Sequence, residues 1–108
     1  SAVLQECHGL IAFHRDDPEE AVRQLRLAAE GWQRLARPYA EARACITLAR
    51  ALAAAGGDDR VPAVQARAAQ LLVALANELD DEQARADFRA SPLVRAMGPV
   101  PDNLLQLD

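Results

Sequence analysis

The sequence predicts an all-helical fold of two stacked antiparallel helical hairpins, followed by a short C-terminal helix and an extended tail. Ala and Leu dominate the 108 residues, whereas aromatic residues make up only 4%, a composition that suits closely packed helices better than a sheet. Breaks containing Pro or Gly divide the chain into segments in which apolar residues recur every three or four positions. The connections are short, so consecutive helices should be antiparallel neighbours.

The first hairpin is predicted over residues 2–36. Its first helix covers about residues 2–15. The second helix begins at Pro18, which suits the first turn, with Asp17 as N-cap. Apolar residues at steps of three and four form one stripe along the second helix: Ala21, Leu25, Ala28, Trp32 and Leu35. Within this stripe, Trp32 is expected to fill the space between the two hairpins.

The second hairpin is predicted over residues 38–79. A helix from Pro38 ends before Gly56, a residue that commonly stops helices. Another helix runs to about Leu79, and a short terminal helix is expected over residues 81–97. These elements form one helical domain over residues 1–97, and residues 98–108 form the extended tail.

The charge pattern makes several classes of partner improbable. The net charge is −4, all twelve basic residues are Arg, and no basic stripe is present. We therefore expect no direct contact with nucleic acid, whose backbone is recognised by clustered positive charge. No apolar run is long enough to span a membrane. Cys7 and Cys45 both lie in apolar helical runs, which predicts two reduced, partly buried thiols in a cytoplasmic protein.

Small and large residues alternate in a pattern that resembles tetratricopeptide repeats. Gly9-x2-Ala12 is followed by Ala21-x3-Leu25-x2-Ala28, with acidic residues at the turn, although the second unit is degenerate and the period is about 41 residues rather than 34. Residues 30–43, with their Trp, Leu-Ala, Pro-Tyr and Glu-Ala-Arg elements, are similar to junctions in helical arrays of large multidomain bacterial transcriptional regulators. The resemblance implies a right-handed superhelix that recognises proteins within a larger cytosolic signalling or transcriptional regulator.

The residue types that support catalysis or metal binding do not converge in the predicted fold. Glu6, Cys7 and His8 are adjacent on one helix, so their side chains point about 100° apart. The zinc-binding spacings CxxC and HxxxH are absent. The acidic pairs stand at helix starts and turns, where capping explains them. We therefore predict no enzyme activity, no cofactor and no metal site.

Two surfaces could instead bind a protein or peptide partner, or another domain of a parent chain. The resemblance implies that the first helix of each hairpin lines a concave groove. A partner's carboxylate could bind Arg there, while the alternative is a solvated face that makes local ion pairs, for example with Glu41. The predicted groove residues are Gln5, His8, Arg43, Thr47 and Arg50.

The first helix is the second candidate surface, because it carries apolar side chains nearly all round. We expect such a helix to have neighbours on both sides. Either a preceding repeat or another copy of the chain should cover it. A homodimer through this helix, in which the chain is a self-contained bundle, is therefore the alternative to a binding module within a larger regulator.

Overall fold

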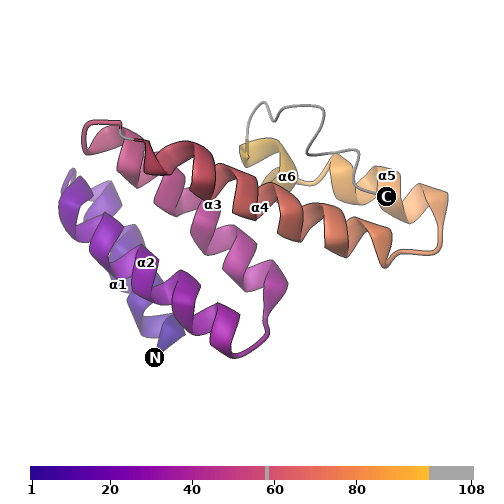
Figure 1. The fold of residues 1–108 in the computed structure, drawn as a ribbon, viewed down its shortest axis with the longest axis horizontal. Coiled ribbons are helices and arrows are strands. Elements are labelled where there is room, and N and C mark those ends of the chain that lie inside the picture. The colour runs from indigo at the N-terminus through magenta and orange to yellow at the C-terminus, as the bar shows by residue number, and fades with distance from the viewer. Residues whose placement is uncertain (58, 98–108) are drawn as a thin grey trace.

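The computed structural model describes residues 1–57 and 59–97, so the predicted extended tail at residues 98–108 lies outside the described residues. Within the described ranges the structure contains helices and no strand, which confirms the predicted all-helical fold. Figure 1 shows the helices stacked in succession. They are α1 (Ala2–His14), α2 (Pro18–Arg34), α3 (Pro38–Ala54), α4 (Arg60–Asn77), α5 (Glu82–Arg89) and α6 (Pro92–Ala96).

Each of the four long helices packs chiefly on its neighbour in sequence, as stacked hairpins require. α1 contacts α2, α2 contacts α3, and α3 contacts α4, whereas α1 touches α3 only slightly. Across the described residues α1 and α4 share no substantial contact, so this is an open stack rather than a closed four-helix bundle. The stack therefore has two ends, and α1 forms one of them (Figure 1).

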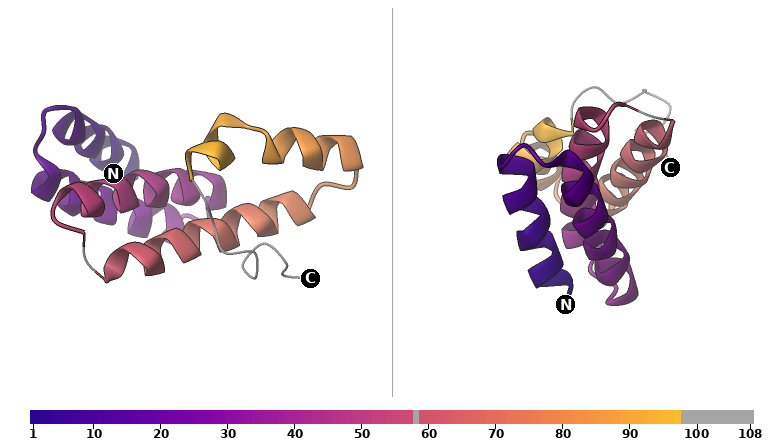
Figure 2. Two further views of the ribbon diagram at one scale, coloured as in Figure 1. Left: turned by 90° about the horizontal axis from the view of Figure 1, so that it is seen from above. Right: turned by 90° about the vertical axis from the view of Figure 1, so that its left-hand side faces the viewer.

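The other end of the stack is covered by α5 and α6, which fold back over α4 (Figure 2). The terminal segment predicted over residues 81–97 consists of two short helices, because Ser91 and Pro92 separate α5 from α6. The side chains of this segment pack on a buried cluster that joins α3 and α4: Phe88, Leu93, Val94 and Met97. The apolar end of the second hairpin is thereby shielded from water.

Three of the helix ends share one hydrogen-bond pattern. Asp16, Ala36 and Gly56, spaced twenty residues apart, each have positive φ. The backbone N–H of the following residue donates a hydrogen bond to a carbonyl oxygen in the last helical turn, as in a Schellman motif. The N···O distances are 2.9–3.0 Å for Asp17 to Ala12, Arg37 to Trp32, and Gly57 to Leu52. Each helix-plus-turn unit thus spans twenty residues and each hairpin forty, which accounts for the period longer than 34.

Replacing Ala36 with Gly should stabilise the protein. Ala36 has a left-handed backbone conformation, with φ at 55°, and its Cβ makes this conformation costly by about 1 kcal/mol. Chemical denaturation should show the free energy of unfolding of Ala36→Gly raised by about 1 kcal/mol. The control Ala53→Gly, at an exposed position inside α3, should lower it by a similar amount. A lower stability for Ala36→Gly would contradict the described turn.

The first hairpin is closed by a contact that requires glycine. A Cβ built on Gly9 would lie 2.6 Å from Cγ of Leu25, which is fully buried on α2. This confirms that a small residue at Gly9 lets the two helices approach closely. Because the inner side of α1 is occupied by Ala2, Gly9 and Ala12, the larger side chains of this helix point elsewhere.

Candidate interaction surface

A buried carboxylate ties the first three helices together. Glu6 on α1 is only 6% exposed. Its Oε1 accepts hydrogen bonds from Nε1 of Trp32 at 3.0 Å and Nη2 of Arg43 at 2.8 Å, and its Oε2 accepts one from Nε of Arg43 at 2.7 Å. The hydrogen bonds to Glu6 raise the pKa of the Arg43 guanidinium. Trp32 is half-buried, so it serves as a hydrogen-bond donor between helices rather than as a fully buried core residue.

A second ion pair of the same kind joins α3 to α4. Glu41 is 5% exposed, and its Oε2 accepts a hydrogen bond from Nε of Arg67 at 2.8 Å. Both arginine side chains, 44% exposed in Arg43 and 43% in Arg67, reach from the surface to a buried carboxylate. The first ion pair therefore joins α1 to α3 and the second joins α3 to α4, in an arrangement that supports the stack.

Sequence reasoning did not identify Glu6 as the partner of Arg43. The candidate considered for a local pair was Glu41, but Glu6 is the partner, 37 residues away. A usable signal was present, because Glu6 lies four positions after Ala2 and three before Gly9, on the small-residue stripe of the helix. A carboxylate on a buried stripe requires a charged partner.

The predicted groove residues take part in separate contacts. Nη2 of Arg50 donates to the carbonyl of Ala96 at 3.0 Å, and Oγ1 of Thr47 donates to the carbonyl of Arg43 at 3.3 Å. Gln5 is half-buried and His8 is exposed. Partner binding by this set stays a prediction.

His8 and the Glu6–Arg43 pair lie on different sides of α1. Residues two apart on a helix point about 200° from each other. His8 lies beside α2, where its charge makes a small contribution to lowering the pKa of Glu20, after the larger effect of the hydrogen bonds from Arg23. A small ligand bound by Arg43 would therefore not contact His8 directly.

The outward side of α1 carries a group of exposed aliphatic residues. Val3 is 56% exposed, Leu4 58%, Leu10 37% and Ile11 48%. Together with the exposed Cys7, these residues form what we name the α1 outer face. Their spacing of three and four places them along one side of the helix. Elsewhere in the described residues, exposed large hydrophobic side chains occur on other elements: Leu27 on α2, Leu35 at the C-cap of α2, and Tyr39 on α3.

The two cysteines have different environments. Cys45 is buried as predicted, and burial, with a smaller effect from Glu41, raises the pKa of its thiol to about 11. The prediction that Cys7 is also partly buried is wrong, because small residues occupy the inner side of α1 and place Cys7 outside. Among residues 1–57 and 59–97, no three His, Cys, Asp or Glu side chains gather in a metal-binding arrangement.

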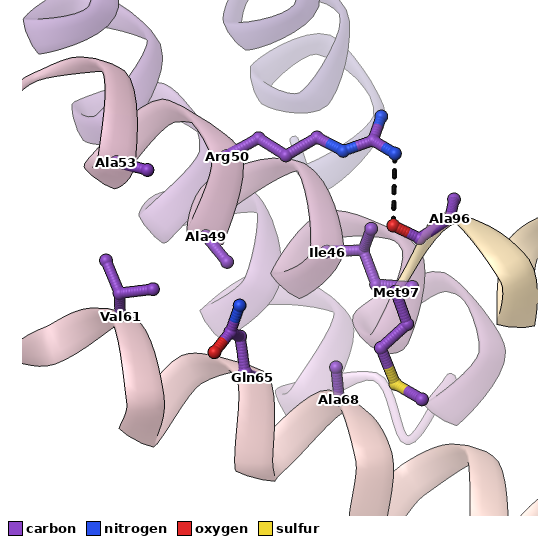
Figure 3. A pocket seen from close by; sticks show the side chains of 9 residues that line it. All are labelled: Ile46, Ala49, Arg50, Ala53, Val61, Gln65, Ala68, Ala96 and Met97. Carbon is purple, nitrogen blue, oxygen red and sulfur yellow. Dashed lines mark hydrogen bonds between the residues drawn. The ribbon is translucent and has the colours of Figure 1, made fainter. Parts of the chain in front are cut away.

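A cavity of about 130 Å³ lies between α3, α4 and α6. Its lining is mostly apolar, with polar groups from Arg50 and Gln65 (Figure 3). The Arg50 hydrogen bond to Ala96 holds α6 beside the cavity. Pockets for drug-sized ligands typically measure about 300–1,000 Å³, so this space is better explained as incomplete packing beneath α6.

The described helices and the comparisons with known proteins add two findings. In the part of the chain that the structure describes, no helix combines the length and hydrophobicity needed to cross a membrane. No protein-family model, curated protein or solved structure matches the chain. The relationship to tetratricopeptide arrays therefore stays a prediction.

Proposed function

We propose that this chain is a protein–protein interaction module that binds its partner through the α1 outer face. The observation that carries the proposal is the distribution of side chains on α1: Ala2, Gly9 and Ala12 face the protein, while four larger aliphatic residues are 37–58% exposed. Exposed apolar groups that gather on one surface commonly mark interaction sites. Burying them removes apolar area from water, which favours association by about 25 cal/mol per Å².

The shape of this surface favours a macromolecule over a small molecule. A helix of 13 residues is about 20 Å long, and its outer face is convex. Small-molecule sites are concave and surround most of the ligand. A second helix can lie along the whole face and contact each aliphatic side chain, as in helix–helix packing.

We also propose that the module works within a larger cytoplasmic signalling or transcriptional regulator. The resemblance of residues 30–43 to junctions in tetratricopeptide-like arrays supports this context. The partner would then be another protein, a peptide segment or another domain of the parent chain. The two ion-paired glutamates and the shielded end at α5–α6 would keep the stack rigid while α1 engages the partner.

The proposal is tested by immobilising the chain and measuring proteins retained from a lysate of the source cells. The double variant Leu4→Glu/Ile11→Glu places charge on the outer face, and Leu27→Glu/Leu35→Glu places equal charge at other exposed positions. Circular dichroism should show that both variants stay folded. We expect the wild type and the control to retain a set of proteins that the α1 variant loses. Equal retention by all three would contradict a role for α1.

A further inference from the structure

We propose that the α1 outer face binds the same face of a second copy of this chain, with the two α1 helices antiparallel around a twofold axis at Cys7. This inference rests on the proposed function and names the partner. A twofold interface is self-complementary, because the same patch from each subunit must fit its own image. The α1 outer face has the residue order that this symmetry requires.

The outer face is a palindrome of side-chain types centred on Cys7. Leu4 and Leu10 lie three positions before and after it, and Val3 and Ile11 lie four positions before and after it. In an antiparallel pair crossing at Cys7, residues that precede it on one helix lie opposite residues that follow it on the other. At each end of the contact, leucine would thus lie opposite leucine and valine opposite isoleucine, with the smaller cysteine at the crossing point.

The charge distribution permits this self-association. The chain has a net charge of −4, yet the five residues of the outer face carry no charged side chain. In an antiparallel pair, the positive end of each helix dipole lies near the negative end of the other. The contact therefore places no like-charged side chains of the outer face opposite one another.

A preceding helical hairpin fits the same face less well. When the sequences of α1 and α3 are aligned on their equivalent turns at Asp16 and Gly56, Leu4 corresponds to Ala44 and Ile11 to Ala51. Both alanines are fully buried, and Ala51 packs in the cluster shared with α2. Their small side chains permit the close approach of the first hairpin, whereas leucine and isoleucine at those positions hold a neighbouring backbone farther away.

The size of the contact sets its expected strength. Stable complexes commonly bury about 800 Å² on each partner, and one helix about 20 Å long offers less than this. We therefore expect a reversible dimer with a dissociation constant on the order of 10 μM. Self-association should be visible at accessible protein concentrations and should reverse on dilution.

Sedimentation equilibrium from about 1 to 500 μM, a range that brackets this estimate, measures the expected dimer. The wild type and the Leu27→Glu/Leu35→Glu control should change from monomer to dimer as the concentration rises. Leu4→Glu/Ile11→Glu should remain monomeric, with at least a tenfold weaker association. A wild type that is monomeric throughout, or a dimer that the α1 variant leaves unchanged, would overturn the inference.

Cys7 provides an independent test of the twofold geometry in the Cys45→Ser protein, after circular dichroism has shown that this variant stays folded. Helix axes 8–10 Å apart, with Cα atoms on cylinders of about 2.3 Å radius, bring facing Cα atoms to about 5 Å, within the span of a disulfide. A mild chemical oxidant takes up two electrons as two Cys7 thiols lose their protons and form one S–S bond. We expect cross-linked dimers to accumulate at least tenfold faster than in the Leu4→Glu/Ile11→Glu background.

Equal cross-linking in the two backgrounds would overturn the placement of Cys7 at the twofold axis. The outcomes also distinguish this inference from the proposed function. A monomeric wild type that still retains other proteins through α1 would contradict the second copy as partner and leave the interaction module standing. The absence of both self-association and α1-dependent retention would contradict the two proposals together.

Discussion

Replacing Leu25 with Ala should lower the free energy of unfolding by about 3 kcal/mol, the largest effect expected from a single core substitution in the first hairpin. Leu25 is one of the two largest fully buried side chains. It packs in a cluster with Leu48 and Leu52 of α3, so its truncation leaves a cavity that involves α3 as well as its own hairpin. The loss combines the transfer free energy of the removed atoms with the cost of that cavity.

The close approach of Gly9 to Leu25 allows a sharper form of this test. Gly9→Ala alone should destabilise the protein by about 1–2 kcal/mol, because the new Cβ overlaps the Leu25 side chain, despite the better helix propensity of alanine. In the Leu25→Ala background that overlap is removed, so Gly9→Ala should be neutral or stabilising. The two substitutions should therefore be strongly non-additive, as expected of residues in contact.

Urea denaturation of the wild type, the two single variants and the double variant measures this coupling. Leu35→Ala is the matched control, because Leu35 is 61% exposed and its truncation should change stability by no more than about 0.5 kcal/mol. Additive effects at Gly9 and Leu25 would show that the two residues do not touch.

Replacing Glu6 with Ala should be the second large effect, with a loss of about 2–3 kcal/mol. The substitution leaves the indole N–H of Trp32 without its acceptor and removes the charged partner of Arg43. The cost is below that of a fully buried ion pair, because the Arg43 side chain is 44% exposed and can be hydrated. Glu6→Gln should lose less, since its amide oxygen can still accept a hydrogen bond.

The emission of Trp32 provides a readout specific to this contact, because it is the single tryptophan of the chain. Glu6→Ala should change its emission maximum in the native state and lower the denaturation midpoint. Glu30→Ala, which removes an exposed carboxylate from α2, should change neither measurably. A Glu6→Ala protein with wild-type stability and wild-type emission would contradict the hydrogen bonds through which Glu6 joins α1 to Trp32 of α2 and Arg43 of α3.

Local sequence features were sufficient to predict most of the fold. Pro18, Pro38 and Gly56 mark helix boundaries through their backbone chemistry, which acts on the nearest residues. Apolar spacing within each segment then identified the helices and the stripe that contains Leu25. The close approach at Gly9 was also predictable, because a glycine within an apolar helical stripe indicates that another helix lies near.

Features that depend on distant contacts were harder to predict. The partner of Arg43 is set by how α1 stacks beside α3, and nothing near Arg43 in the sequence specifies Glu6. The left-handed turn at Ala36 was hidden because alanine rarely adopts positive φ. Similarly, Cys7 belongs to an apolar run, and only the inward orientation of the small residues places its thiol on the outside.

The candidate surface combines both situations. The surplus of apolar residues in the first helix was visible in the sequence, and the structure shows which of them are exposed, whereas the neighbour expected to cover them stays a prediction. The groove residues Arg43 and Arg50 were chosen by their spacing on one helix face, whereas the structure shows that each already donates to an acceptor of another helix. Both guanidinium groups thus have acceptors within the chain, whereas the apolar side chains of the α1 outer face are exposed.

The central claim is that the α1 outer face is the surface through which two copies of this protein associate. Methyl-selective NMR during a dilution series tests it most directly, because Val3, Leu4, Leu10 and Ile11 each carry methyl groups. Concentration-dependent shifts confined to these four residues are the predicted result, while the methyl groups of Leu27 and Leu35 stay unchanged. Shifts at Leu27 or Leu35 instead, or no shift at any concentration, would contradict it.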